Sequence, residues 1–272
     1  MNSIIIKDFL NKNPDFSLFI GIPAYGGNLK SGFVQSLMKL QAIFLRLGIP
    51  HDYLYLSGES LICRGRNAIV SKFLATPHSH LLFLDTDLIF NPASIVNMII
   101  NDFQIVGLSY PKKGINWNKA KHMIENNNFD KNSLSDMNFN PLLDEDGNCK
   151  TLQRFMCAKD IPTGGMLINR NVFYTLMRKY PELRYQNNIS RYDDQLCYDF
   201  FRVGVCPESN FYLSEDYYFC KLLRDSGYEL WIDYKSALGH IGEYEYWGSI
   251  DNELQSGLIQ YNKDLVKING NR

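Results

Sequence analysis

Four consecutive large apolar residues, Leu81 to Leu84, run directly into the triplet Asp85-Thr86-Asp87. An uninterrupted apolar run of this kind predicts a strand that is buried on both faces of a sheet. Side chains alternate along an extended backbone, so Asp85 and Asp87 project toward the same side where the strand ends. Two close carboxylates repel each other, and we therefore expect a divalent cation, a basic side chain or a shared proton beside them. An acidic turn after a strand is the alternative.

Strands and helices alternate in the first 110 residues. The predicted strands cover 17–22, 51–56, 81–84 and 104–108, and the predicted helices cover 32–47, 63–74 and 92–101. This alternation predicts an α/β fold with a mostly parallel sheet flanked by helices, whose ligands bind beyond the carboxyl ends of the strands. Three segments follow strands at that edge: 23–27, 59–66 and 85–87.

The second half of the chain is less regular. An excursion rich in Asn, Asp and Lys is expected over 119–150, and a second irregular stretch over 185–211. Between and after them the pattern predicts an antiparallel hairpin of strands 151–158 and 165–169, helices over 172–179 and 214–226, and a strand over 228–233. No internal repeat or interdomain linker is visible, so we expect a single domain over 1–272.

The composition is that of an ordinary globular protein, with 45% hydrophobic residues and a net charge of −1. This near-neutral charge gives no electrostatic case for nucleic acid as a partner. Residues 1–16 lack the apolar core of a signal peptide, and no later segment has the length of a membrane span. The six cysteines lack the spacing of a zinc site, so we expect mostly buried free thiols in a soluble, cytoplasmic protein.

Six short segments share an order with a known family. They are the strand end Ile22-Pro23-Ala24-Tyr25, the helix start Arg64-Gly65-Arg66-Asn67, Asp85-Thr86-Asp87, Pro162-Thr163-Gly164-Gly165, Ser214-Glu215-Asp216 and Gly239-His240. Over about residues 17–247 this order resembles the GT-A fold (Rossmann-like) glycosyltransferases, near the inverting family-2 enzymes and the small stand-alone transferases of large DNA viruses and phages. The resemblance implies a nucleotide-binding half (17–110), an acceptor and catalytic half (111–249) and a C-terminal helix or tail (250–272), in the host cytoplasm if the protein is viral.

The resemblance implies metal-dependent transfer of a sugar, with inversion, from a nucleotide-sugar donor to a glycan, glycoprotein or other hydroxyl acceptor. UDP is the expected carrier, ahead of GDP and dTDP. Breaking the donor's glycosidic bond builds negative charge on its diphosphate, which Mn²⁺ or Mg²⁺ would neutralise. By resemblance Asp87 is the direct metal ligand, Asp85 lies nearer the ribose or reaches the metal through water, and His240 is a late third ligand. Glycines on both sides of His240 would let the backbone approach the phosphates.

Other residues are expected to bind the donor. Arg64 and Arg66, at a helix start, would meet the diphosphate or the sugar through forked hydrogen bonds, although a solvated pair of arginines is the alternative. Asn67 is a partner for the donor or the base edge, and Pro23 and Tyr25 would line the nucleoside pocket. By resemblance, the remaining donor-binding residues are Asp85, Thr86, Gly164 and Gly165, with the small glycines beside the donor sugar.

The acceptor hydroxyl must lose a proton as it attacks, and a nearby carboxylate is the usual base. Glu215 and Asp216 match the acidic pair that opens a helix in inverting GT-A enzymes, where the second acid is the base. The alternative is a structural helix start, since Ser214 is a good N-cap and acids in a first turn are stabilised by the helix dipole. Trp117, Tyr244, Tyr246 and Trp247 are candidates for the acceptor face, but each one could equally belong to the core.

Two other function classes remain open. Phosphohydrolases of the haloacid dehalogenase type also present an Asp-x-Asp after an apolar strand, and Asp193-Asp194 would then supply later metal ligands. Those enzymes place the motif near the chain start, whereas two strand–helix units precede it here. A catalytically silent sugar-nucleotide or glycan-binding module is the third class. The presence of one acidic pair suited to a metal and a second acidic pair suited to a catalytic base argues against it.

Overall fold

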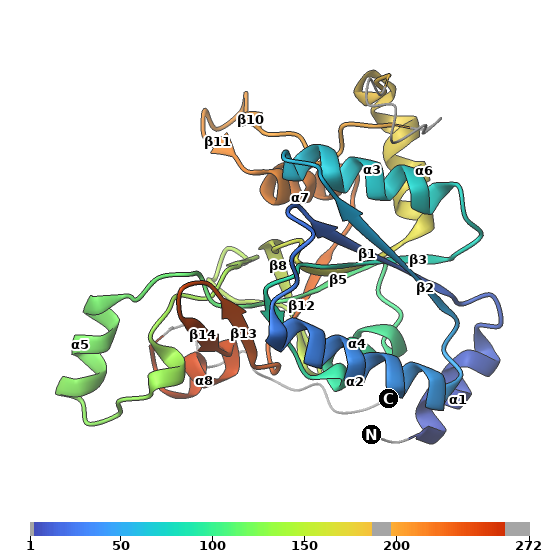
Figure 1. The fold of residues 1–272 in the computed structure, drawn as a ribbon. Coiled ribbons are helices and arrows are strands. Elements are labelled where there is room, and N and C mark those ends of the chain that lie inside the picture. The colour runs from blue at the N-terminus through green and yellow to red at the C-terminus, as the bar shows by residue number, and fades with distance from the viewer. Residues whose placement is uncertain (1–2, 187–196, 259–272) are drawn as a thin grey trace.

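The computed structural model describes residues 3–186 and 197–258 (Figure 1). Its centre is a nine-stranded sheet formed by β1 (Leu18–Ala24), β2 (His51–Ser57), β3 (His80–Leu84), β5 (Ile105–Leu108), β6 (Asn140–Pro141), β7 (Thr151–Leu152), β8 (Phe155–Asp160), β9 (Gly165–Asn169) and β12 (Leu230–Asp233). The strand order is β2-β1-β3-β9-β5-β12-β8-β6, and β7 pairs with β8. All of these strands run the same way except β8 and β9. The predicted α/β class with a mostly parallel sheet is confirmed.

Helices cover both faces of this sheet (Figure 1). One face carries α1 (Ser3–Lys12), α2 (Ser31–Leu47) and α4 (Pro92–Ile100), and the other carries α3 (Ile62–Leu74), α6 (Arg170–Lys179) and α7 (Glu215–Asp225). The β3 residues alternate between the two cores: Leu81 and Phe83 pack with α3, α6 and α7, while Leu82 and Leu84 pack with α1, α2 and α4. All four side chains are fully buried, as the apolar run predicted.

One predicted pairing is wrong. The strands at 151–158 and 165–169 do not form a hairpin with each other, because β5 and β12 lie between β9 and β8. Residues distant in sequence enter the sheet at these positions, and a local pattern predicts that a strand exists but not its neighbours. A small antiparallel hairpin occurs instead between β10 (Gly204–Val205) and β11 (Tyr212–Leu213).

A second small sheet lies next to the triplet Asp85-Thr86-Asp87. It contains β4 (Leu88–Ile89), β13 (Leu238–Ile241) and β14 (Glu245–Gly248) in the order β14-β13-β4, all antiparallel. In this sheet His240 is the partner of Leu88, and the backbone N of Ile241 donates to the carbonyl of Asp87 at 2.7 Å. The pairing therefore brings the C-terminal His240 beside Asp87.

The stretch predicted to be irregular over 119–150 contains more structure than expected, with α5 (Trp117–Glu125), the 3₁₀ turn η1 (Lys131–Ser133) and β6. A second 3₁₀ turn, η2 (Pro181–Leu183), follows α6, and α8 (Ile250–Gln255) begins the predicted C-terminal helix or tail. The six cysteines all lie in the described residues, where none forms a disulfide and five are buried. The division into two functional halves stays a prediction.

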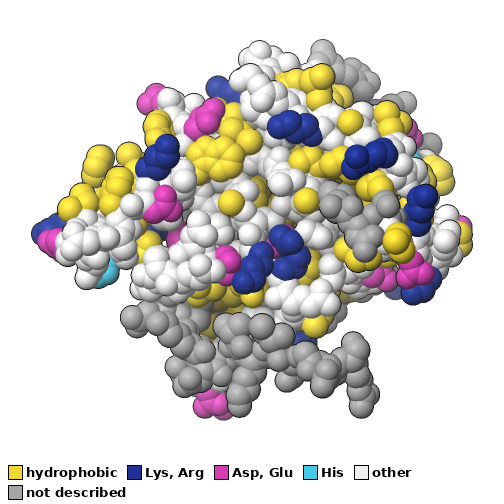
Figure 2. Space-filling model, turned by 90° about the horizontal axis from the view of Figure 1, so that it is seen from below, with side chains coloured by type: hydrophobic (Ala, Val, Ile, Leu, Met, Phe, Trp, Pro, Cys, Tyr) yellow, Lys and Arg dark blue, Asp and Glu magenta, His cyan; other side chains and the backbone are white. Residues whose placement is uncertain are grey.

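The surface carries both signs of charge. On the face shown in Figure 2, basic and acidic side chains are interspersed among hydrophobic ones, and the coloured part of that face has no continuous basic area. Among the described helices, none combines the length and the apolarity that crossing a bilayer requires.

Candidate functional site

The candidate site lies at the topological switch point of the central sheet. The chain places β2 on one side of β1 and β3 on the other, so the topological switch point lies between β1 and β3. Ligands of such sheets bind outside the carboxyl ends of the strands at this point. The acidic triplet Asp85-Thr86-Asp87 follows β3 there. The start of β9 lies at the same edge, because β9 runs antiparallel to β3 and Gly165 is the partner of Leu84.

Asp85 is held by a buried arginine from α3. Nη2 of Arg66 donates to Oδ2 of Asp85 at 3.1 Å, and the Arg66 side chain is only 4% exposed. On its other side, Nε of Arg66 lies 3.7 Å from Oε1 of Glu215, the first residue of α7. Burial disfavours the charged guanidinium, but Asp85 and Glu215 outweigh it and raise the pKa of Arg66 above its usual range. A permanent positive charge therefore lies between two carboxylates.

Asp87 has different partners. Its Oδ2 accepts from Nζ of Lys113 at 2.5 Å, and its Oδ1 lies 3.5 Å from Nε2 of His240. Burial alone would raise the pKa of Asp87, but His240 and Lys113 outweigh it and lower this pKa to about 2. The other imidazole nitrogen, Nδ1 of His240, is bonded to the carbonyl of Pro111 at 2.8 Å. A carbonyl oxygen can only accept a hydrogen bond, so Nδ1 carries the proton in this contact. The second ring nitrogen, Nε2, faces Asp87.

The buried phenol of Tyr110 interacts electrostatically with the charged groups of this site. It is 5% exposed, and its ring packs edge-on against His240 with the centroids 4.9 Å apart. Burial raises the pKa of Tyr110 well above its ordinary value, and Asp85, Asp216 and Asp87 add to this while Arg66 opposes it. The Tyr110 hydroxyl is therefore a neutral hydrogen-bonding group that interacts with the charges of Asp85, Asp87, Asp216 and Arg66.

Gly164 lies against this centre. A Cβ added to it would lie 2.5 Å from Oδ2 of Asp85 and 2.6 Å from the Tyr110 hydroxyl, so these groups would have to move to admit any side chain. Gly165 is also buried, and its Cβ would meet Leu108 at 3.2 Å. The sequence predicted small residues at these positions to leave room for a donor sugar. The contacts with Asp85 and Tyr110 favour glycine at 164 within the protein itself, and the role of both glycines beside a donor sugar stays a prediction.

Glu215 and Asp216, the acidic pair predicted to include the catalytic base, are the first two residues of α7. Oδ1 of Asp216 accepts hydrogen bonds from the Ser214 hydroxyl and from the backbone N of Tyr217, at 3.1 Å for the latter. Ser214 occupies the N-cap position, but its hydroxyl makes no capping bond to the helix backbone. Burial raises the pKa of Glu215, Arg66 opposes this, and Asp216 and Asp85 add to it. Glu215 thus contacts Arg66, while Asp216 is oriented by its neighbours in the first turn.

Two residues predicted to bind the donor are engaged within the protein. Arg64 makes two hydrogen bonds to Glu59, from Nε to Oε2 and from Nη2 to Oε1, both at 2.8 Å. The Asn67 amide donates to Oδ1 of Asp199 at 2.9 Å and accepts from the backbone N of Phe201 at 3.1 Å. Both side chains therefore fix local structure around α3, and their contacts with a nucleotide stay predictions.

The remaining predicted donor contacts lie at the open side of the edge. Tyr25, directly after β1, is 69% exposed, whereas Pro23 and Thr86 are partly buried. The carbonyl of Thr86 accepts from the backbone N of Lys30 at 3.1 Å, which fixes the triplet to the start of α2. Tyr25 is thus available to a ligand at the switch point.

The glycines beside His240 have a packing role. A Cβ on Gly239 would lie 3.0 Å from the Trp247 ring, and a Cβ on Gly242 would lie 3.3 Å from Cδ of Lys113. Of the predicted acceptor aromatics, Trp117 is 74% and Tyr244 is 54% exposed, whereas Tyr246 and Trp247 are partly buried.

Unpartnered polar atoms concentrate at this edge. Seven buried side-chain nitrogen or oxygen atoms of the described residues have no hydrogen-bond partner, and five belong to the edge: Nε and Nη1 of Arg66, Oδ1 of Asp85, Oγ of Ser109 and Oγ1 of Thr163. Ser109 directly follows β5, and Thr163 precedes Gly164. Buried polar groups are nearly always paired in folded proteins, so such a cluster indicates a site for a polar ligand, an ion or water.

The donor set fits a divalent cation in part. No group of three His, Cys, Asp or Glu side chains in the described chain is arranged to hold a metal ion. Asp87 and His240 do form a carboxylate–imidazole pair, and oxygen and imidazole ligands suit Mn²⁺. Two protein ligands are enough when phosphate oxygens and water complete the coordination shell. Asp85 is instead paired with Arg66, so the fit rests on Asp87 and His240.

No family model and no curated protein matches this chain. Several solved structures align with it, and two of them illustrate how low the similarity is. The catalytic domain of Drosophila beta1,4-galactosyltransferase 7, in a complex with xylobiose, is 12% identical, with a TM-score of 0.37 over 88% of this chain and 73% of that chain. The inositol-1-phosphate CTP transferase from T. maritima is 10% identical, with a TM-score of 0.36 over 80% of this chain and 89% of that chain.

At these TM-scores the alignments assign neither an activity nor a family. The likeness to transferases of large DNA viruses and phages stays a prediction. Asp193 and Asp194, the later acids of the phosphohydrolase alternative, lie outside the described residues.

Sequence reasoning missed Tyr110 and Lys113. Both follow β5, whose carboxyl end lies at the same edge as that of β3. The rule that identified the segments after β1, β2 and β3 applies equally to the segment after β5. That signal was present in Tyr110-Pro111-Lys112-Lys113.

Proposed function

We propose that this chain is a glycosyltransferase that moves a sugar, with inversion, from a nucleotide-sugar to a hydroxyl of a glycan or glycoprotein. The single observation that carries the proposal is the cluster of unpartnered buried polar atoms at the switch point, two of them on the guanidinium of Arg66. A nucleotide diphosphate supplies both the negative charge and the many acceptor oxygens that such a guanidinium lacks. We expect UDP as the carrier, ahead of GDP and dTDP.

Departure of the nucleotide leaves negative charge on the diphosphate, and catalysis requires positive charge fixed there in advance. Arg66, which is buried, and Lys113, which is partly exposed, supply positive charge at the site. Asp87 and His240 would hold Mn²⁺ or Mg²⁺, which when bound neutralises the diphosphate as a Lewis acid. Lys113 and His240 both contact Asp87 in this structure. If Asp87 binds a metal ion instead, the ammonium group of Lys113 becomes available to a phosphate.

Asp216 is the proposed base. Its carboxylate accepts the proton of the acceptor hydroxyl as that hydroxyl attacks the anomeric carbon. The hydrogen bonds from Ser214 and from the backbone of Tyr217 hold Oδ1, which leaves Oδ2 for the acceptor. Glu215 does not share this role, because it faces Arg66 and serves to position that side chain.

Titration calorimetry with UDP-, GDP- and dTDP-sugars, with and without Mn²⁺, tests the proposal. We expect one nucleotide class to bind in a metal-dependent manner, and Asp87→Ala to weaken that binding. Unchanged affinity in Asp87→Ala would remove the metal assignment. Absence of binding by every nucleotide-sugar would overturn the proposal as a whole.

A phosphohydrolase receives less support from the same contacts. In that chemistry the first aspartate attacks a phosphate as a nucleophile, and the ion pair with Arg66 reduces the nucleophilicity of Asp85. Release of inorganic phosphate from simple phosphomonoesters would reverse this preference. A silent binding module would bind the nucleotide-sugar but release no UDP in the presence of any acceptor.

A further inference from the structure

A cleft lies along α7, apart from the residues that we propose to bind the diphosphate. It occupies about 720 Å³ between α7, the β10–β11 hairpin and the ends of β6 and β8. Its lining includes Asn140, Asp160, Phe211, Tyr212, Tyr217 and Arg224. The volume is in the range of small-molecule binding sites, about 300–1,000 Å³. None of the residues around Asp85 and Asp87 lines it.

The charges of the cleft cancel. Three acidic and three basic side chains line it, and most are paired with each other. Nη1 of Arg224 bonds Oδ1 of Asp160 at 2.7 Å, and Nζ of Lys221 lies 2.5 Å from Asp225 and 3.1 Å from Glu208. Such a surface offers both hydrogen-bond donors and acceptors but attracts neither anions nor cations, so it suits a neutral polar ligand.

Aromatic side chains form the outer wall. Phe211 and Tyr212, at the second strand of the hairpin, are 72% and 70% exposed, and Val205 on the opposite strand is 55% exposed. Large apolar side chains gathered beside a cleft indicate a binding surface. Because aromatic rings are both apolar and polarised, they pack well on the C–H faces of polyhydroxylated rings while hydroxyls at the rim find polar partners.

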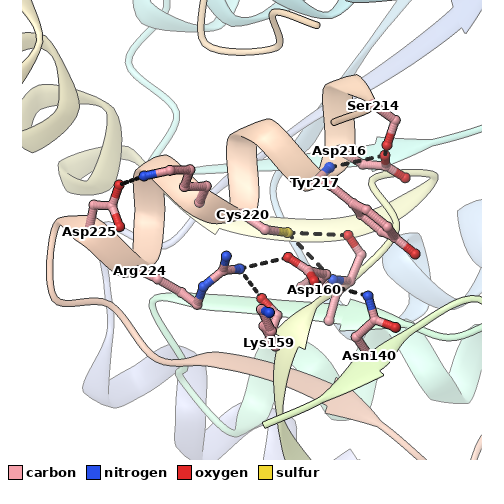
Figure 3. A network of polar contacts seen from close by, with 11 residues as sticks. Asn140, Lys159, Asp160, Ser214, Asp216, Tyr217, Cys220, Arg224 and Asp225 are labelled. Carbon is pink, nitrogen blue, oxygen red and sulfur yellow. Dashed lines mark hydrogen bonds and ion pairs between the residues drawn. The ribbon is translucent and has the colours of Figure 1, made fainter. Parts of the chain in front are cut away.

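Tyr217, which lines the cleft, directly follows the predicted base Asp216 in the first turn of α7. In Figure 3, Asp216 and Tyr217 leave the first turn of α7, and the Tyr217 ring points toward Asp160 and Asn140 in the cleft wall. The amide of Asn140 donates to Oδ2 of Asp160 at 3.0 Å, which joins the ends of β6 and β8. The cleft wall and the predicted base therefore come from the same turn of α7.

We propose that this cleft binds the acceptor, and that the acceptor is a neutral oligosaccharide whose rings stack on Phe211 and Tyr212. The inference rests on the proposed function for its catalytic meaning, since it identifies the substrate whose hydroxyl Asp216 would deprotonate. It replaces the predicted acceptor face around Trp117 and Tyr244, which lies on α5 and next to β14.

A printed array of neutral and anionic glycans, probed with the labelled full-length chain, tests this. We expect neutral glycans to bind, and Phe211→Ala and Tyr212→Ala each to weaken binding by about tenfold, which corresponds to the loss of one stacked ring. Tyr212→Phe should retain binding because it keeps the ring. Phe129→Ala, which removes another exposed aromatic ring, is the matched control and should bind as the wild type does.

The outcomes separate this inference from the proposed function. If glycans bind but both alanine variants keep their affinity, or if only Trp117→Ala loses it, the cleft is not the acceptor site. Preference for anionic glycans, or no glycan binding by the wild type, also overturns the inference. Calorimetry of UDP with Mn²⁺ on the same variants should be unchanged in every case, whereas failure of the wild type to bind any nucleotide-sugar would count against the proposed function itself.

Discussion

Arg66 and Asp85 form an ion pair between the start of α3 and the end of β3, with the two heavy atoms 3.1 Å apart. The arginine is almost fully buried, and two of its nitrogens, Nε and Nη1, make no hydrogen bond within the described protein. A buried cation that is only partly paired costs stability in the empty protein, and a ligand that completes its hydrogen bonds recovers that cost. The site therefore favours binding of an anion with several acceptor oxygens.

Replacing Arg66 with Met should destabilise the protein strongly. Removal of one member of a buried pair leaves Asp85 and Glu215 without compensation, at a cost of about 3–5 kcal/mol. The matched control is Arg178→Met on the exposed face of α6, which should change stability by less than about 0.5 kcal/mol. Urea unfolding of both variants measures the difference. Equal stabilities would show that Arg66 is compensated by groups other than these carboxylates.

Replacing Lys113 with Met should strengthen Mn²⁺ binding in the absence of nucleotide. The lysine occupies one oxygen of Asp87, and loss of a partly exposed ion pair of about 1 kcal/mol corresponds to roughly fivefold in affinity. Lys112→Met removes the neighbouring exposed lysine and is the control. Electron paramagnetic resonance of free Mn²⁺ gives the affinity directly. A weaker or unchanged affinity in Lys113→Met would mean that the lysine does not compete with the metal.

The pKa of Asp87 predicts a specific acid sensitivity. It falls from 3.8 to about 2 in the folded protein, so the ionised carboxylate stabilises the fold above the unfolded value. This stabilisation, roughly 2 kcal/mol from the size of the shift, is lost as the pH falls from about 4 to about 2. Asp87→Asn should therefore show a shallower decrease of unfolding free energy over that range. Asp15→Asn, at an exposed position, should retain the wild-type slope.

Gly164→Ala should disturb the site more than the fold. The new methyl group would overlap Oδ2 of Asp85 and the Tyr110 hydroxyl, and relief of such overlap costs about 1–3 kcal/mol. We expect nucleotide affinity to fall as Asp85 moves. Gly204→Ala is the control, because a Cβ there meets no atom within 4 Å. Wild-type nucleotide affinity in Gly164→Ala, measured by calorimetry, would exclude Asp85 from the donor site.

Asp216→Asn should lose transfer while it retains nucleotide binding. Removing a general base lowers the rate by about 10²–10⁴-fold. The amide still accepts the bond from Ser214, so the first turn of α7 should persist. Glu182→Gln, a change at an exposed acid, should leave the rate unaffected. If Asp216→Asn transfers sugar at the wild-type rate, the base lies elsewhere or the enzyme retains configuration.

The elements near the start of the chain were predictable because each carries its own local signal. Helix α2 follows an amphipathic pattern and ends at Gly48 in the left-handed conformation, and α3 and β3 were predicted within a residue or two of their bounds. The position of Asp85 and Asp87 followed from the same local signal, since a buried strand must end before its first charges.

The partners of those residues were harder to predict because they depend on long-range pairing. Neither the ion pair between Lys113 and Asp87 nor the bonding of Asn67 to Asp199 is visible in the spacing of the sequence. The same reason explains the failed hairpin of β8 and β9. Arg64 and Arg66 lie two positions apart on one helix, yet only Arg66 turns toward Asp85, while Arg64 turns to Glu59 in the preceding loop.

The position of β12 has a consequence for how this chain is synthesised. Because β12 lies between β5 and β8, residues 230–233 must leave the ribosome before those two strands acquire their shared neighbour. Until then both present open edges, which are prone to pair with other chains. Nascent chains stalled before residue 230 should therefore stay sensitive to protease at β5 and β8, whereas chains released after residue 258 should resist it.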